Sequence, residues 1–467
     1  MLLSKQVRHC APSGCTTELD GSADRLRLLF RRMAQEVTVH QKFSRARSSF
    51  RGLASHGSAV VQIGLVSVLG IAASFGFQIV TARFLGPSDF GVLSAFFSIV
   101  SMAAIGSSSL QNSVAVQTAR SLGQPRLFTV KRKKLDGFTI EALTLGGTGA
   151  LIVVAASPVI VTGLRTEFFV PLLAAVSIVL SFVFARAVGT IQGVGDSRSA
   201  VWWSSISLVV RLALVAVAFV AGFGLVGALT AVLIASGLVM TGAFIHSLRL
   251  HSTDGYIPFR LEGIIVMLMS VAFAWLTNID VILVRAFVSE HSAGIYAASA
   301  TLVKSGFLIP ATLSLYLLPR FVRQEKNAAM TRLGVRLTLL VTGVGGFVMF
   351  LAFSLVGPWL THLLFGSEYN ISGALLGGLS LAYLPWMMAH GLLIRMNALA
   401  SKLAIATLAC AVVFQFVAAI IFLPNVTALL VTIGIVGAIV LVLFLFIDRA
   451  RSAGIVATPE PSSAVSP

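Results

Sequence analysis

The stretch FQIVTARFLGPSDFGVLSAFFS, residues 77–98, joins two long apolar segments through a short hydrophilic corner. It returns in altered form about two hundred residues later as IDVILVRAFVSEHSAGIYAASA, residues 279–300. Arg83 matches Arg285 at an offset of 202, and Gly91 matches Gly294 at an offset of 203. Ser157-Pro158 and Ser197-Arg198 match Gly357-Pro358 and Ser401-Lys402 in the same order. This constant spacing indicates an internal duplication, with halves at residues 57–251 and 259–451.

The composition of the chain is that of a membrane protein. Of its 467 residues 57% are hydrophobic and 11% are charged, and the mean hydropathy is +0.94. Soluble domains carry about 25% charged residues. A helix of about 20 apolar residues crosses a bilayer core of about 30 Å. We therefore expect an all-α polytopic membrane protein with about twelve transmembrane helices in two six-helix lobes. The predicted spans are residues 58–82, 90–116, 138–163, 168–190, 200–222, 224–247, 261–284, 293–318, 336–364, 372–394, 403–423 and 427–447.

Basic residues predict the orientation, because Lys and Arg near span ends stay on the cytoplasmic side. They gather in the loops after the second and eighth spans, at Arg120, Arg126, Lys131, Arg132, Lys133, Lys134, Arg320, Arg323, Lys326 and Arg332. The odd-numbered loops hold single basic residues. Both termini are therefore expected in the cytoplasm. Topology and attraction to anionic membrane lipids account for the formal net charge of +17, so we expect no nucleic-acid partner.

The regions outside the two halves are short. Residues 1–56 are polar and basic, and we expect a disordered cytoplasmic extension, with an amphipathic helix near residues 26–33 as the alternative. Residues 252–258 are expected to form a cytoplasmic linker, and residues 452–467 a disordered tail. Cys10, Cys15 and Cys410 have neither metal-ligand nor redox spacing, so free thiols are expected.

Charged residues inside the predicted spans are the main clue to function. Each costs about 2.5–3.5 kcal/mol at the centre of a lipid-facing helix, so such residues normally face a protein interior or a watery cavity. The charged residues within spans are Arg186, Arg211, Asp280 and Lys304, and Arg83 and Arg285 lie at the outer ends of the first and seventh spans. The excess of cations predicts a cavity for an anionic substrate, because guanidinium and ammonium groups bind phosphate oxygens.

Structural roles remain open for several of these residues. Arg186 could instead extend its side chain to the cytoplasmic surface, since its span ends near Gln192. Asp280 could neutralise one of the cations, or it could be a protonatable carboxylate that couples transport to an ion. Gln78 takes the place of Asp280 in the first half, so a coupling carboxylate would belong to the second half alone.

The sequence offers little for catalysis. It contains no P-loop, no GxSxG motif and no His, Asp or Glu cluster with metal-ligand spacing. The loops between spans on the outer side are too short to hold a catalytic domain. We therefore expect no enzyme activity and no cofactor.

The motifs also resemble those of a known family. ARFLGPSDFGVLSAFFSIV resembles the ARxLGPxxFGxY signature of Wzx-like polysaccharide flippases of the multidrug/oligosaccharidyl-lipid/polysaccharide exporter superfamily. NIDVILVRAFVSEHSAGIYAASATL resembles the aspartate-containing seventh helix and the following GxYxxA corner of that family, and PWLTHLLFGSEYN resembles its segment after the ninth helix. The sequence departs from the signature at Val92-Leu93, where an aromatic residue is usual after the glycine, and in its long basic N-terminal extension.

The resemblance implies a bundle in the bacterial cytoplasmic membrane whose central cationic cavity opens alternately to each side. The implied substrate is a polyprenyl-diphosphate-linked oligosaccharide, flipped outward for cell-surface polysaccharide, with a polysaccharide polymerase and glycosyltransferases as further candidate partners. The anion-binding role would fall on Arg83, Arg186, Arg211, Arg285 and Lys304, and the coupling role on Asp280. A drug or metabolite antiporter of the same superfamily, or a membrane polymerase or ligase for the same lipid, are the alternatives.

Overall fold

The structure is a computed structural model that describes residues 20–122, 136–250, 261–310, 328–398 and 401–457. The chain divides into two compact units, Met1–Leu65 and Val66–Pro467, and the contacts reported below lie within the second unit. Most of the basic loops after the second and eighth spans, Cys10, Cys15 and the 252–258 linker lie outside the described residues. Cys410 is an exposed free thiol, as expected.

Helix α1, Asp20–Leu122, contains the first corner. Its apolar part, residues 62–121, would be about 90 Å long as a straight helix, which is far more than one bilayer crossing needs. Gly86 breaks the helix with φ 68° and ψ 175°, a conformation open to glycine, and Pro87 follows it. The break divides this part into the two spans that the sequence predicts.

The other helices of the first lobe continue the bundle. They are α2 (Gly137–Ala155), α3 (Ser157–Leu164), α4 (Phe169–Gly193), α5 (Ser197–Val220) and α6 (Gly224–Leu250). Helix α4 packs against α2, α5 and α6. The third predicted span is thus two helices, because Pro158 begins a new helix after a break at Ala156.

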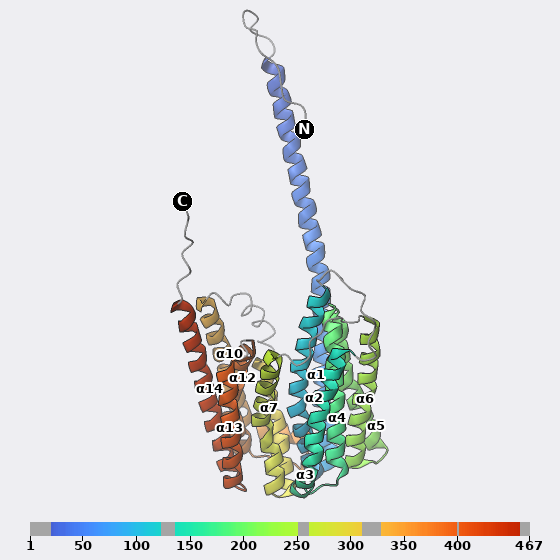
Figure 1. Cartoon of the computed structure of the whole chain (residues 1–467), viewed down its shortest axis with the longest axis vertical. Helices are drawn as coiled ribbons and strands as arrows, with labels where there is room; N and C mark the ends of the chain where they lie inside the picture. The colour runs from blue at the N-terminus through green and yellow to red at the C-terminus, as the bar shows by residue number, and fades with distance from the viewer. Residues whose placement is uncertain (1–19, 123–135, 251–260, 311–327, 399–400, 458–467) are drawn as a thin grey trace, which may run out of the picture. The chain divides into compact units, whose positions relative to one another are not determined.

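The second lobe repeats this pattern. It comprises α7 (Leu261–Phe287), α8 (Glu290–Lys304), η1 (Ser305–Phe307), α10 (Ala328–Leu355), α11 (Gly357–Phe365), α12 (Gly373–Ala398), α13 (Lys402–Phe422) and α14 (Val426–Ala457). Pro358 begins α11 as Pro158 begins α3, so the ninth span is divided at the matching place. Figure 1 shows the helices of the second unit side by side as a bundle.

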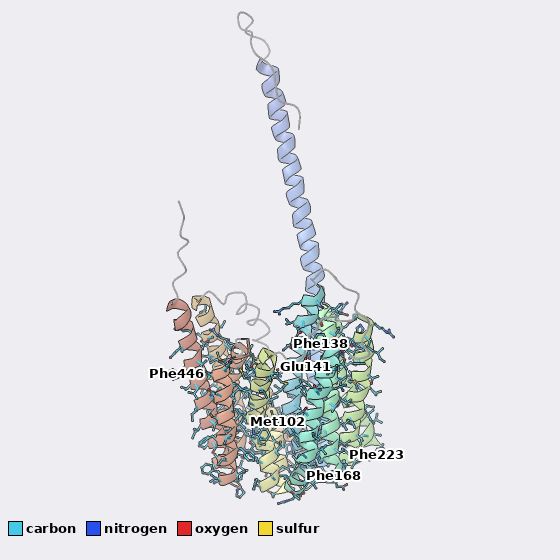
Figure 2. The ribbon with its side chains drawn as sticks, in the orientation of Figure 1. Met102, Phe138, Glu141, Phe168, Phe223 and Phe446 are labelled. Carbon is cyan, nitrogen blue, oxygen red and sulfur yellow. The ribbon has the colours of Figure 1, made fainter. Side chains whose placement is uncertain are left out.

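The bundle has the surface of a membrane protein. In the described residues eleven helices are long and apolar enough to cross a bilayer, and the apolar part of α1 is long enough to cross twice. Large apolar side chains project outward, among them Phe168, Phe223 and Phe446 (Figure 2). The expected fold of about twelve spans in two lobes is therefore confirmed.

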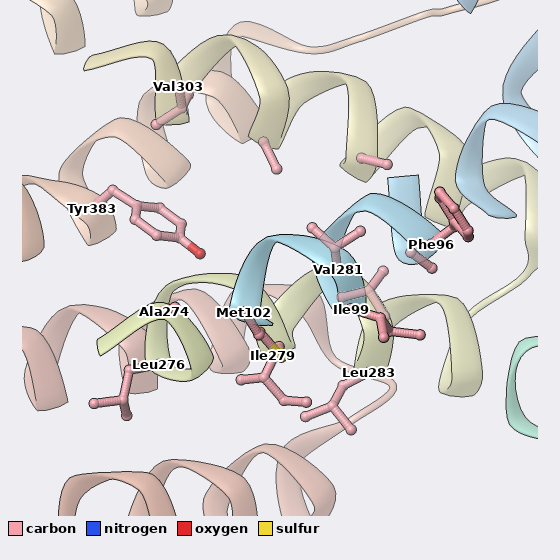
Figure 3. Close-up of a cluster of buried hydrophobic side chains, with 14 of the residues drawn as sticks. Phe96, Ile99, Met102, Ala274, Leu276, Ile279, Val281, Leu283, Val303 and Tyr383 are labelled. Carbon is pink, nitrogen blue, oxygen red and sulfur yellow. The ribbon is translucent and has the colours of Figure 1, made fainter. Parts of the chain in front are cut away.

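The two lobes meet along the second span of α1 and along α7. Phe96, Ile99 and Met102 of α1 lie beside Ile279, Val281 and Leu283 of α7 (Figure 3). Further along this seam the Ser109 hydroxyl donates to the Ser270 hydroxyl at 3.3 Å. The seam places α7, with Asp280, next to the first lobe.

Candidate functional site

A cavity of about 530 Å³ lies between the two lobes. The first lobe lines it with α1, mainly through Ser74, Gln78, Ser94, Ser98 and Ser101. The second lobe contributes Asn278, Thr301, Lys304, Ser305 and His390. Aromatic rings of Phe75, Phe97 and Phe307 complete the wall. Hydroxyl and amide groups together with apolar rings suit a polar, uncharged molecule such as a sugar. We call this the central cavity.

Lys304 is the cation that lines the central cavity, and it has a partner behind it. Its Nζ lies 2.8 Å from Oδ1 of Asp280, and the Tyr296 hydroxyl donates to Oδ2 of the same carboxylate at 2.8 Å. The ammonium also lies 5.2 Å from the centre of the Tyr383 ring, a cation–π distance. The Asp280 side chain is fully buried, whereas that of Lys304 is 17% exposed. Lys304 therefore faces the cavity, and Asp280 neutralises its charge from within the protein.

Arg211 lines a second pocket of about 340 Å³ inside the first lobe. This pocket shares Phe97, Ser101 and Leu208 with the central cavity, so the two adjoin. Six serines line it: Ser101, Ser177, Ser181, Ser204, Ser207 and Ser236. We call it the serine pocket.

The charge of Arg211 is not neutralised within the serine pocket. The guanidinium lies 5.4 Å from the centre of the Phe97 ring and 5.9 Å from that of Phe77, and its Nε has no hydrogen-bond partner among the described residues. Among those residues no acidic side chain lines the pocket. Arg211 is thus the expected site residue best placed to attract an anion.

A third pocket, of about 320 Å³, continues the polar lining. It shares Ile71 and Leu208 with the central cavity and reaches Gln192 and Ser197, where α4 ends and α5 begins. The polar path thus runs toward the end of the bundle opposite the Gly86–Pro87 corner.

Arg186 lies apart from these cavities. It forms an ion pair with Asp136 at the start of α2, and its Nη1 donates to the Ser247 hydroxyl of α6 at 2.6 Å. Its guanidinium also lies 5.1 Å from the centre of the Phe244 ring. Burial raises the pKa of Asp136, but Arg186 and the hydrogen bonds from Thr139 outweigh it and hold the pKa below the ordinary value. In this structure Arg186 links three helices.

The second lobe has a counterpart of this link. Arg395 of α12 pairs with Asp448 of α14, with 2.6 Å between Nε and Oδ1, and both side chains are largely buried. α12 corresponds to α4 in the repeat, and α14 to α6. In each lobe an arginine therefore links the matching pair of helices, α4 with α6 in the first lobe and α12 with α14 in the second.

Arg83 and Arg285 lie at the corner end of the bundle. Arg83 is exposed and donates to the carbonyl oxygens of Leu364, at 2.8 Å, and of Leu363. These carbonyls end α11, where a cation is favourable. Arg285 is buried and lies 3.6 Å from Glu290, which accepts a hydrogen bond from Ser88 at 2.9 Å. These contacts join one half of the repeat to the other.

Two glycines allow the corners to touch. A Cβ on Gly294 would lie 1.7 Å from the carbonyl oxygen of Pro87, and one on Gly91 would lie 3.4 Å from Cα of Gly294. The Tyr369 hydroxyl donates to the Ala82 carbonyl at 3.0 Å nearby. The backbones of the two corners therefore pack closely at this end of the bundle. We call the contact of Gly294 with Gly91 and Pro87 the corner contact.

The structure thus separates the six residues that the sequence grouped. Lys304 and Asp280 form one pair, Arg211 lies in the adjoining serine pocket, Arg186 links helices of the first lobe, and Arg83 and Arg285 belong to the corner end. Sequence reasoning missed Tyr296. Tyr296 precedes Lys304 by eight residues, which places both on one side of α8. This spacing could have identified Tyr296 from the sequence.

Comparison with known proteins agrees with the fold. A multidrug resistance MATE transporter of the MOP superfamily, solved in an inward-facing conformation, superposes with a TM-score of 0.59 at 16% identity, covering 86% of this chain and 99% of that one. The eukaryotic MATE transporter AtDTX14 gives a TM-score of 0.59, also at 16% identity, over 85% and 98% of the two chains.

Sequence relatives are mycobacterial. An uncharacterised protein of Mycobacterium tuberculosis is 24% identical over 373 residues, which cover 77% of this chain and 82% of the relative. A second protein from that species is 25% identical over 358 residues, or 74% and 79% of the two chains.

The fold, with its two lobes, is similar to that of the solved MATE transporters. Residues 59–325 match the sequence profile of the polysaccharide biosynthesis protein family, and the chain belongs to that family. The resemblance to the Wzx-like flippases and their superfamily is thereby confirmed.

Proposed function

We propose that this protein flips a polyprenyl-diphosphate-linked oligosaccharide outward across a bacterial cytoplasmic membrane, for assembly into cell-surface polysaccharide. One observation carries the proposal: a cavity rich in hydroxyl and amide groups adjoins a pocket that holds an arginine without an acidic partner. The central cavity would hold the sugars, and Arg211 with Lys304 would hold the diphosphate. Family membership supports a role in polysaccharide synthesis.

The proposed transport cycle uses the two ends of the bundle in turn. The positive-inside rule puts the corner end outside and both termini in the cytoplasm. The corner contact would close the outer side while the polar path through Gln192 and Ser197 admits substrate from the cytoplasm. Opening the corner contact would then release the substrate outside. Arg83 and Arg285 would bind the diphosphate as it leaves through this opening. Arg186 would hold the helices of the first lobe together.

The protein would act as a transporter and not as an enzyme, on a substrate made by membrane glycosyltransferases and used by a polymerase. The test is a strain of the source organism without this gene. It should accumulate a lipid-linked oligosaccharide and lose a surface polymer, and the wild-type gene should restore both. An unchanged lipid pool together with an unchanged polymer would contradict the proposal.

A drug transporter is the second candidate, because solved structures with this fold are named multidrug resistance transporters. The aromatic rings in the central cavity suit an apolar cation as well. This candidate predicts that loss of the gene sensitises cells to cationic drugs and leaves the lipid-linked sugars unchanged.

A further inference from the structure

Most hydroxyl groups of the central cavity already use their hydrogens inside the protein. A serine or threonine hydroxyl has one hydrogen to donate and two lone pairs that accept. Four of the hydroxyls that line the cavity donate to a backbone carbonyl three or four residues earlier in the chain. They belong to Ser98, Ser101, Thr301 and Ser305, with donor–acceptor distances of 2.9, 3.0, 2.9 and 2.6 Å. While these bonds are kept, each hydroxyl offers a ligand only lone pairs.

Asn278 of α7, which also lines the cavity, has the same polarity. Its Nδ2 donates to the Ala274 carbonyl at 2.8 Å and lies 3.4 Å from the Thr277 hydroxyl oxygen. An amide has two donor hydrogens, so both are used within α7. Its carbonyl oxygen Oδ1 accepts no hydrogen bond from the described residues. We call this oxygen and the four hydroxyl oxygens the acceptor wall.

The serine pocket continues this polarity. Five of its six serines donate to a carbonyl three or four residues earlier, namely Ser101, Ser177, Ser181, Ser204 and Ser236. Phosphate oxygens are themselves acceptors, so a phosphate gains from these walls only where a cation stands. Among the described lining residues of the two pockets the cations are Lys304 and Arg211. The acceptor wall is therefore left for a neutral part of the ligand that donates hydrogen bonds.

We propose that the central cavity recognises the hydrogen-bond donors of its ligand, and that this ligand is a glycan whose hydroxyls carry no methyl or acyl group. The inference deepens the proposed function and rests on it only for the lipid that carries the glycan. A sugar ring presents several hydroxyls, each with a hydrogen to give. A hydroxyl capped with a methyl or acyl group has none, so it would meet the acceptor wall with lone pairs alone.

The rest of the cavity lining also fits a sugar. Ser74 and Gln78, on the first span of α1, have no side-chain hydrogen bond to the described residues, so they can donate to the ring oxygen of a sugar or accept from its hydroxyls. The rings of Phe75, Phe97 and Phe307 offer apolar surface to its carbon atoms. An apolar cation has few N–H groups or none, and it would leave the acceptor wall unpaired. The wall therefore favours the glycan over a cationic drug.

Ligand-observed NMR on the full-length protein in lipid nanodiscs, free of sugar detergents, tests this polarity. The probes are the methyl glycosides of glucose, galactose and mannose, together with an analogue of each in which fluorine replaces three ring hydroxyls. Fluorine is close to a hydroxyl in size but donates no hydrogen bond. At least one hydroxylated glycoside should bind, and its fluorinated analogue should bind at least about tenfold more weakly, because several hydrogen bonds are lost.

Thr301→Val removes one acceptor and keeps the shape of the side chain. It should weaken binding of the hydroxylated probe about threefold to tenfold and so narrow the gap between the two probes. Ser101→Ala removes another acceptor and serves if Thr301→Val does not fold. Thr241→Val is the matched control, because the Thr241 hydroxyl also donates to a carbonyl four residues earlier, that of Gly237 at 2.8 Å, but is exposed and lines none of the pockets described above. This control should bind both probes as the wild type does.

Three results would overturn the inference: no binding of any hydroxylated glycoside, equal binding of the fluorinated analogues, or an unchanged gap between the probes in the folded acceptor variants. Any of them leaves the proposed function standing if the deletion strain still accumulates a lipid-linked oligosaccharide. Selective binding of the hydroxylated probes by a protein whose deletion leaves the lipid-linked sugars unchanged would uphold the acceptor wall and refute the lipid-linked substrate.

Discussion

Among the basic residues predicted inside the spans, Arg211 has no acidic partner in the part of the chain that the structure describes, whereas Arg186 and Lys304 each have one. Lys304, Arg186, Arg285 and Arg395 each form an ion pair, and each pair lowers the field that a substrate would meet. The guanidinium of Arg211 instead lies over the rings of Phe77 and Phe97. A buried cation without a counter-charge is unfavourable on its own, which suggests that the counter-charge is supplied by the substrate.

Replacing Arg211 should therefore impair export without unfolding the protein. Hydrogen bonds to charged groups contribute about 1.5–3 kcal/mol, so Arg211→Gln should reduce export about tenfold to a hundredfold. Lys304→Gln should have a similar effect. Surface polysaccharide and protein abundance, measured in the complemented deletion strain, test this.

Two matched controls are available for these variants. Arg249→Gln and Lys402→Gln remove exposed cations at the last turn of α6 and the start of α13, and they should leave export unchanged. Normal surface polysaccharide in both cavity variants would contradict an anion-binding role for these residues.

The ion pair of Arg186 with Asp136 predicts a pH-dependent stability. The pKa of Asp136 is lowered in the folded protein, so its contribution is complete above the ordinary value of about 3.9 and is lost as the pH falls through the folded value. Asp136→Asn keeps an N-cap acceptor for Thr139 but removes the charge. It should lower the free energy of unfolding by about 1.5–3 kcal/mol at neutral pH, the usual contribution of a hydrogen bond to a charged group.

Thermal unfolding in detergent at a series of pH values measures this effect. The difference between Asp136→Asn and wild type should close in acid, below the folded pKa of Asp136. Asp196 also caps a helix and has a lowered pKa, but it forms no ion pair with the described residues. Asp196→Asn is therefore the control, and it should lose less stability than Asp136→Asn. Equal stability of Asp136→Asn and wild type at neutral pH would contradict the account.

Residue types in the spans predicted that charges would be inside the protein, but not which charges would meet. Asp280 and Lys304 are 24 residues apart and meet because α7 and α8 pack side by side. Arg186 meets Asp136, which the sequence places in a basic loop and gave no reason to single out. Such pairs depend on how helices rotate against one another, and periodicity within one helix does not contain that information.

At the scale of elements, the corner contact is the part of the structure that the proposed transport cycle requires to open. Its two glycines come from the matching corners that reveal the repeat in the sequence. Because glycine has no side chain, the two backbones can lie in direct contact. Such a contact can separate without exposing buried side chains at these two positions. The sequence predicted the corners well, because Gly86-Pro87 at the first and Ser289-Glu290-His291 at the second interrupt long apolar runs.

Gly294→Ala should prevent the corner contact from closing, because the added Cβ would lie 1.7 Å from the Pro87 carbonyl oxygen. The central cavity should then be reachable from outside. A Ser98→Cys probe, in a background with the native cysteines replaced, should react faster with a membrane-impermeant thiol reagent, by about tenfold if closure loses about 1.4 kcal/mol. Gly237→Ala, where a Cβ meets nothing within 4 Å, is the control. Equal reactivity with and without Gly294→Ala would show that this contact does not close the outer side.

At the scale of the whole molecule, the two halves share a fold and differ in charge. Gln78 and Ser101 stand where the second half has Asp280 and Lys304, and Gln415 stands where the first half has Arg211, at the offset of 204 that Ser197 and Ser401 keep. Duplication explains the shared helices, while each half supplies a different cation: Lys304 lines the central cavity, and Arg211 lines the adjoining serine pocket. The fold was predictable because hydropathy and repeats are properties of the chain. The central cavity was not predictable in this detail, because residues of both halves line it.

The measurement that tests the central claim most directly is the leaflet location of the lipid-linked sugars in the deletion strain. A membrane-impermeant glycosidase should leave the accumulated oligosaccharide intact in whole cells and cleave it once the membrane is permeabilised. That result would place the block at outward transfer of the lipid-linked sugar. Cleavage in whole cells without permeabilisation would show that the sugar crosses the membrane without this protein, and would contradict the flippase account.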